Sequence, residues 1–243
     1  MVKAQRTIYL LLSAVLLTWC GARPAAEQLP AGGGAEIPAE VPKYVALTFD
    51  DGPRWDTTPR LLDGLRERGA SATFFLVGEQ IQANAEVVQR MQREGHQVGN
   101  HTWSHADLRG ASDDVVGREI GKTDALLQEL LGEGTYWVRP PYGLLNQRQR
   151  QLFSVPLVHW TVDPEDWKLR NTEADVKAVL EAVKPGDIVL MHDSVPATVD
   201  AALEIVDTLQ QQGYVFVTVE ELLRLNDVTP QPGVMYRSAA LYS

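Results

Sequence analysis

The stretch "VALTFDDGP" occupies residues 45–53, and it decides how the fold is interpreted. The residues before Asp50 are apolar or β-favouring, which predicts a buried strand. This strand runs directly into Asp50 and Asp51 and then into a Gly-Pro turn. Adjacent carboxylates repel each other, so their place at the end of a buried strand predicts a functional site.

Short β-like runs alternate with helical patterns along the rest of the chain. Alternating strands and helices favour parallel strands joined by crossovers. The sequence therefore predicts a single α/β domain with about seven parallel strands in a closed or nearly closed barrel, with a doubly wound open sheet as the alternative. No GxGxxG motif opens the first helix, so nothing favours a dinucleotide site. The expected strands are 45–49, 72–77, 96–100, 136–139, 156–162, 187–191 and 214–219.

The expected helices lie between these strands and end at glycines where the apolar spacing stops. One begins at Thr58-Pro59 and ends before Gly69. Thr172 and Asp175 suggest a capping box for the helix 173–183. The other helices are expected over 81–91, 116–130 and 199–209.

The N-terminus has the pattern of an export signal. A short positive region at Lys3 and Arg6 precedes an apolar stretch, 8–19, that is too short for a comfortable transmembrane span. An uncleaved anchor is the alternative. We therefore expect an exported protein of the cell envelope, either membrane-anchored or secreted.

The only cysteine, Cys20, ends this apolar stretch and resembles the lipidated residue of a bacterial lipoprotein. Trp19 stands where such signals have a small residue, so cleavage near Ala22 or Ala26 is an equal alternative. In either case the folded part contains no cysteine, which excludes disulfides and thiolate chemistry there.

The chain divides by composition into four parts. Residues 1–22 are the expected signal, and residues 23–42 form a Pro/Gly-rich linker that cannot build a core. The folded domain is expected over 43–226, followed by a tail, 227–243. The formal net charge is −10, which argues against nucleic acid as a partner, and the sequence does not give the oligomeric state.

Unusual polar residues follow five of the expected strands. Closed α/β barrels build their sites from the loops at the C-terminal ends of the strands. Five polar segments at one end of a barrel are hard to explain as folding requirements. They are Asp50-Asp51, "HTWSH" (101–105), "RPPYG" (139–143), "DPEDW" (163–167) and "MHD" (191–193).

His101 and His105 are spaced i, i+4, so on a helical turn both imidazoles can reach one metal ion. The alternative is a pair of surface histidines that cap a loop. One of the opening aspartates can complete the site, and the resulting open coordination positions are typical of a catalytic metal. The other aspartate stays free as a base, and Arg139 can orient it.

His192 ends a buried-looking strand. A carboxylate from "DPEDW" would keep its imidazole protonated near neutral pH, as a general acid requires. The alternative is a core histidine satisfied by a backbone carbonyl, the role expected of His96 and His159. Glu165 and Asp193 are expected to be solvated or capping residues.

In this order and spacing, "TFDDGP", "HTWSH", "RPPYG", "DPEDW" and "LMHD" resemble the five signature motifs of the polysaccharide deacetylases, family four of the carbohydrate esterases. The resemblance covers about residues 43–225. It implies a distorted (β/α) barrel that removes acetyl groups from N-acetylated sugars. The implied cofactor is a divalent ion, usually zinc, with cobalt, nickel or manganese as alternatives.

The resemblance also assigns roles to individual residues. These are Asp51, His101 and His105 as metal ligands; Asp50 as general base, positioned by Arg139; the backbone N–H of Tyr142 as oxyanion donor; His192 as general acid, tuned by Asp166; and Trp167 and Leu190 as walls of the acetyl pocket. Trp103, Tyr142 and Trp55 are candidates for stacking on sugar rings, with packing as the alternative, which is favoured for Trp137 and Trp160.

Export beside a bacterial envelope favours peptidoglycan as the substrate, with release of acetate from N-acetylglucosamine units. Poly-N-acetylglucosamine, chitin oligosaccharides and O-acetylated xylan are alternatives that would use the same motifs. An Fe(II) oxygenase would share the two histidines and a carboxylate but has no use for the second aspartate or for His192. A glycan-binding module without catalysis is the remaining alternative.

Overall fold

The computed structural model describes residues 42–240. The expected signal, Cys20 and nearly all of the linker lie outside this range. Within it, no helix is both long and apolar enough to span a bilayer.

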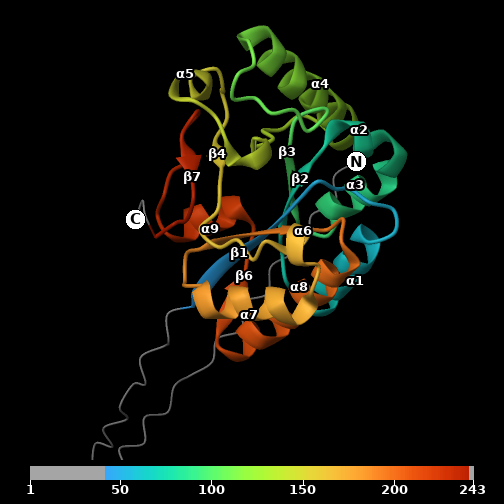
Figure 1. Cartoon of the computed structure of the whole chain (residues 1–243), viewed down its shortest axis with the longest axis vertical. Coiled ribbons are helices and arrows are strands. Elements are labelled where there is room, and N and C mark those ends of the chain that lie inside the picture. The colour runs from blue at the N-terminus through green and yellow to red at the C-terminus, as the bar shows by residue number, and fades with distance from the viewer. Residues whose placement is uncertain (1–41, 241–243) are drawn as a thin grey trace, which may run out of the picture. The chain divides into compact units, whose positions relative to one another are not determined.

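A parallel sheet forms the centre of the domain (Figure 1). Strand β1 (Lys43–Asp50) pairs with β5 (Ile188–His192) on one side. On its other side it pairs first with β6 (Tyr214–Phe216) and then with β2 (Thr73–Leu76), which continues to β3 (Gln97–Asn100). The α/β class and the parallel strands are as predicted.

The rest of the barrel wall is made of short or single pairings. Val138 bridges Asn100 of β3 and Leu157 of β4 (Leu157–Val158), and Val162 bridges Val189 of β5. The expected strand 136–139 is thus reduced to one bridging residue, and 156–162 to a two-residue strand and one bridge. Prolines at 140, 141 and 156 lack the N–H that a longer ladder needs.

The C-terminal segment supplies a strand that the hydrophobic pattern does not predict. Strand β7 (Met235–Tyr236) pairs in parallel with β4, and both residues are buried. Strand β6 is shorter than the predicted 214–219, because Thr218 caps helix α9 (Val219–Leu225) together with Glu221.

Most helices lie near their predicted positions and surround the sheet (Figure 1). The expected helix 81–91 is broken by a 3-10 turn, where the side chain of Asn84 donates to the carbonyl of Gln80. The predicted capping box of Thr172 is wrong, because Asn171 is the N-cap and accepts from the N–H of Ala174. The helices are α1 (Thr58–Glu67), α2 (Gly78–Ile81), η1 (Gln82–Asn84), α3 (Ala85–Arg93), α4 (Asp113–Leu131), η2 (Pro141–Gly143), α5 (Gln147–Arg150), α6 (Asp166–Leu169), α7 (Thr172–Ala182) and α8 (Pro196–Gln211).

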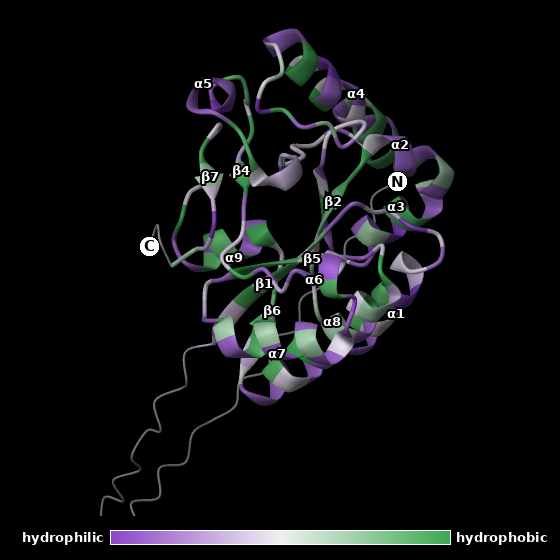
Figure 2. Ribbon diagram, viewed as in Figure 1, coloured by the Kyte–Doolittle hydropathy of each residue, from purple (hydrophilic) through white to green (hydrophobic). Residues whose placement is uncertain are grey.

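The side chains of β1 alternate between two hydrophobic cores, and this alternation determines which of them face the interior of the barrel. Val45, Leu47 and Phe49 pack in the cluster beneath α1 and α8, whereas Ala46 belongs to the cluster inside the barrel. Because side chains alternate along a strand, Thr48 and Asp50 also face the interior. Figure 2 shows the hydrophobic colour concentrated on these central strands and the hydrophilic colour on outer helix faces.

Candidate active site and metal centre

Asp50 and His192 are neighbours across two parallel strands. They are register partners at the ends of β1 and β5, so both occupy the C-terminal edge of the barrel. Asp50 is 3% exposed, and its Oδ1 accepts a 2.7 Å hydrogen bond from Nη1 of Arg139. Its Oδ2 points the other way and lies 3.7 Å from Nε2 of His101.

Arg139 is fully buried inside the barrel, where an apolar side chain would otherwise sit. Its guanidinium also donates to Oγ1 of Thr48 at 2.7 Å and to the carbonyl of His159 at 3.0 Å, and it lies over the ring of Phe75. Burial lowers the pKa of Arg139, whereas the charge and hydrogen bond of Asp50 raise it. The pair therefore fixes one oxygen of Asp50 and leaves the other free.

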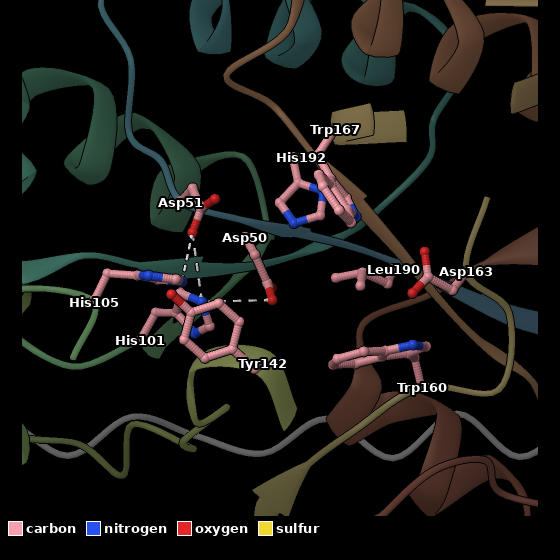
Figure 3. A pocket seen from close by; sticks show the side chains of 10 residues that line it. All are labelled: Asp50, Asp51, His101, His105, Tyr142, Trp160, Asp163, Trp167, Leu190 and His192. Carbon is pink, nitrogen blue, oxygen red and sulfur yellow. Dashed lines mark ion pairs between the residues drawn. The ribbon is translucent and has the colours of Figure 1, made fainter. Parts of the chain in front are cut away.

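Asp51, His101 and His105 come together as a candidate metal centre (Figure 3). One ligand atom from each residue lies within 4.8 Å of the others. Oδ1 of Asp51 is 3.5 Å from Nε2 of His101 and 3.3 Å from Nε2 of His105, and it is buried without a hydrogen-bond partner. An orphaned carboxylate oxygen facing two imidazole nitrogens fits a divalent cation.

The ring of His101 is oriented from behind. Its Nδ1 lies 2.7 Å from the carbonyl of Arg139, so Nδ1–H donates there and Nε2 keeps its lone pair toward the cluster. Burial lowers the pKa of His101, and this effect outweighs the charges of Asp50 and Asp51, which raise it. The imidazole is therefore held neutral, as a metal ligand must be.

His192 is held by Asp166 at the start of α6. Oδ1 of Asp166 lies 2.8 Å from Nδ1 of His192, while Oδ2 accepts from the backbone N–H of His192 and from Oγ1 of Thr198, each at 2.8 Å. Burial lowers the pKa of His192, but the hydrogen bond and charge of Asp166, with smaller effects from Asp50 and Asp51, raise it to about 9. The imidazole is thus kept protonated, with Nε2–H available as an acid.

These groups surround one pocket of about 380 Å³. In Figure 3 the three candidate ligands form one end, and Trp160 and Asp163 lie at the other. Most of the residues predicted for the site line this pocket, and Arg139 and Asp166 lie behind it. The lining residues are Asp50, Asp51, His101, His105, Tyr142, Trp160, Asp163, Trp167, Leu190 and His192.

Two lining residues have no predicted role in the site, and two predicted stacking residues, Trp103 and Trp55, lie outside the pocket. Trp160 was expected to pack inside the barrel, and Asp163 belongs to a quoted motif in which only Asp166 and Trp167 received functions. Their side chains line the pocket because the segment after β4 runs along its rim. Trp103 is outside the lining set, and Nζ of Lys122 lies 3.4 Å from the centre of its ring.

Backbone strain is concentrated at the same pocket. Asp51, His105 and Tyr142 have φ values of 68°, 57° and 61°, a region that favours glycine. Non-glycine residues in this conformation cluster at functional sites, where the surrounding structure holds them. The exposed ring of Tyr142 stands edge-on to His105 with centroids 5.1 Å apart, so the strained turn η2 forms part of the pocket wall.

The remaining acids and histidines have distinct environments. Asp193 was expected to be solvated or capping, but it is fully buried, accepts from Oγ1 of Thr58, and has a pKa raised to about 7 chiefly by burial. His159 fits the expected role, since its Nδ1 lies 3.2 Å from the carbonyl of Trp160, whereas His96 is buried but is not satisfied by a carbonyl, because its Nε2 has no partner within the described residues. Nδ1 of His96 accepts from the N–H of Ala72, and the ring of His159 stacks on Trp160.

The fold and the site define a parallel α/β barrel with an Asp-His-His cluster beside an acid and a base. The sequence model of one family, polysaccharide deacetylase, matches residues 39–154. A peptidoglycan-N-acetylglucosamine deacetylase of Bacillus cereus is 39% identical over 196 residues, which cover 76% of this chain and 92% of that protein. The chain therefore belongs to the polysaccharide deacetylase family.

Two longer relatives are named as deacetylases of different sugars of peptidoglycan. Peptidoglycan-N-acetylglucosamine deacetylase PgdA of Listeria monocytogenes is 42% identical over 189 residues, or 77% of this chain. Peptidoglycan-N-acetylmuramic acid deacetylase PdaC of Bacillus subtilis is 41% identical over 180 residues, or 74% of this chain. The solved structure of PdaC aligns with a TM-score of 0.75 over 76% of this chain and 92% of that one. The chain spans 40% and 38% of the lengths of these two relatives.

Proposed function

We propose that this protein is a metal-dependent hydrolase that removes N-acetyl groups from N-acetylglucosamine units of a polysaccharide, most directly peptidoglycan, and releases acetate. One observation carries the proposal. The unpartnered oxygen of Asp51 faces His101 and His105 in the same pocket that holds Asp50 and His192. A catalytic metal, a general base and a general acid are the three aids that amide hydrolysis near neutral pH requires.

Asp51, His101 and His105 would hold the cation. A bound divalent ion supplies Lewis acidity, which brings the pKa of a water toward ~7 and polarises a carbonyl. Asp50 accepts the proton of the attacking water through Oδ2, since Oδ1 is engaged by Arg139. Fixing one oxygen orients the other toward the ligand cluster, where His101 already lies 3.7 Å from it.

The wall of the pocket receives the acetyl group. Leu190 and Trp167 line it and provide apolar surface for the methyl, and the backbone N–H of Tyr142 meets the charge that develops on the carbonyl oxygen. Loss of one donor of this kind costs ~10²–10³ in rate in other enzymes. His192 then protonates the sugar nitrogen as the C–N bond breaks. Without this proton the amine is a poor leaving group, and the tetrahedral intermediate would lose the added water instead.

Zinc is the proposed ion, since two imidazoles and one carboxylate with open positions suit it. We also propose that residues 1–22 direct export and that the domain works in the cell envelope, either released or anchored near Cys20. The pattern of Lys3, Arg6 and the apolar stretch 8–19 supports export. The names of the relatives support peptidoglycan as the polymer.

The test is release of acetate by the purified protein from peptidoglycan, chitin oligomers and acetylated xylan, with and without a chelator. We expect acetate from peptidoglycan or chitin oligomers, loss of that activity on chelation, and its return with zinc. If acetate is released from acetylated xylan alone, the substrate is an O-acetyl ester and not an N-acetyl amide. Absence of acetate from all three would contradict the proposal.

A further inference from the structure

Asp163 is a pocket residue that the proposed mechanism does not use. It lies on the segment after β4, and its side chain reaches the pocket at the end away from the candidate metal ligands (Figure 3). Its Oδ1 accepts the backbone N–H of Glu165 at 2.9 Å, which fixes the carboxylate. Within residues 42–240, no cationic side chain forms an ion pair with it.

The other charges that face this pocket are balanced by neighbours. Asp50 is paired with Arg139 at 2.7 Å, and His192 with Asp166 at 2.8 Å. Asp51 faces two imidazoles and the proposed cation. The charge of Asp163 also acts on the buried Arg139, but Arg139 is paired with Asp50, and Asp163 has no ion-pair partner of its own within the described residues. Its exposed carboxylate is therefore the one that a substrate in this pocket meets.

We propose that Asp163 is a specificity-determining residue that favours a neutral N-acetylglucosamine ring over a ring that carries a carboxylate on O3, as N-acetylmuramic acid does. This inference rests on the proposed function. The acetamido group is on C2 of the sugar and the O3 substituent is on the adjacent carbon. A ring that places its acetyl group between Leu190 and the ligand cluster therefore brings its O3 substituent to the mouth of the same pocket.

Two physical effects act in the same direction. The 3-hydroxyl of a neutral ring can donate to Oδ2 of Asp163, and the ether-linked carboxylate that replaces it cannot. An anionic substituent is repelled instead, and at ~6 Å in a partly solvated pocket the repulsion amounts to about a three- to tenfold preference.

The experiment compares wild type with Asp163→Asn. Each is incubated with zinc and the disaccharide of N-acetylglucosamine and N-acetylmuramic acid, and mass spectrometry counts acetyl loss from each ring. We expect the muramic-to-glucosamine ratio to rise about three- to tenfold in Asp163→Asn, because asparagine removes the charge at nearly constant shape. Glu165→Gln is the matched control: it removes a charge two residues away on an exposed side chain paired with Lys168, and the ratio should stay at the wild-type value.

A second measurement needs no variant. Raising ionic strength screens exposed charges, so acetyl loss from the muramic ring of the wild type should increase relative to the glucosamine ring. An unchanged ratio in Asp163→Asn, or a wild-type ratio that does not respond to salt, overturns the role of Asp163 while leaving the deacetylase proposal intact. Failure of the wild type to release acetate from either ring overturns the proposed function itself.

Discussion

The pairing of Asp166 with His192 leads to a quantitative prediction for Asp166→Asn. In the wild type the carboxylate of Asp166 accepts a hydrogen bond from Nδ1–H of His192, and the pKa of His192 is raised to about 9. An acid catalyst must be protonated, so its contribution is present below this pKa and is lost as the pH rises through it. Asparagine keeps the shape of the side chain but removes the charge.

The size of the effect follows from the causes of the shift. Burial already lowers the pKa of His192, and without Asp166 only the weaker charges of Asp50 and Asp51 oppose it. The pKa should therefore fall to about 6.5 or below, a shift of at least ~2 units, or ~3 kcal/mol at 1.36 kcal/mol per unit. A cation at Asp51 lowers the pKa in both proteins, so the difference between them is what matters.

The assay is the pH profile of kcat/KM for acetate release from a chitin oligomer. The basic limb of Asp166→Asn should move down by about 2 pH units, which near pH 8 corresponds to roughly 30-fold lower activity. Near pH 5.5 the two proteins should differ by less than about twofold, because His192 is then mostly protonated in both.

Thr198→Val is the matched control, since it removes one hydrogen bond to Asp166 but keeps the charge. Its basic limb should move by less than about one pH unit. A basic limb of Asp166→Asn that coincides with that of the wild type would refute the assignment of His192 as the acid raised by Asp166. A uniform loss of rate at every pH would likewise show a structural role.

Two further substitutions test the other carboxylates. Asp50→Asn should lower kcat by about 10²–10⁴-fold while zinc content, measured by atomic absorption, stays near one ion per chain, because the base is removed and the ligands are kept; near-normal turnover would disprove the base. Asp175 is fully buried with both oxygens unpartnered within the described residues, and burial and Asp166 raise its pKa to about 6. A carboxyl whose folded pKa lies above its unfolded value favours folding below the unfolded pKa and loses that contribution as the pH rises through the folded one. Asp175→Asn should therefore stabilise the protein by about 1–3 kcal/mol near pH 7.5 and by much less near pH 4, as measured by urea unfolding, and equal effects at both pH values would contradict this account.

Sequence reasoning located the parts of the site that depend on local signals and parallel topology. A buried strand that ends in Asp50-Asp51 and another that ends in His192 had to present these residues at one edge once both strands were parallel. The register of β1 and β5 places Asp50 and His192 opposite each other. His101 and His105 also meet in the ligand cluster, but the helical turn assumed from their i, i+4 spacing is wrong: residues 101–105 form a loop without helix, in which Thr102 and His105 have φ values of 67° and 57°.

Other features depend on contacts between distant segments and left no local signal. Thr48 and Thr198 look like ordinary strand and helix residues, yet they hydrogen-bond to Arg139 and Asp166 across 91 and 32 residues of chain. Strand β7 is two residues long and becomes a strand only through β4. The sequence does not show which of the two acids, Asp163 or Glu165, belongs to the site. Only the structure shows that Asp163 lines the pocket and Glu165 does not.

Zinc binding to the wild type and to His101→Ala, measured by equilibrium titration of the metal-free protein, tests the central claim most directly. Oδ1 of Asp51 and the two imidazoles should bind one ion per chain in the wild type, and removal of the buried imidazole should weaken that binding by at least ~100-fold. Wild-type protein that binds no zinc, or His101→Ala that binds it as tightly as the wild type, would contradict the account.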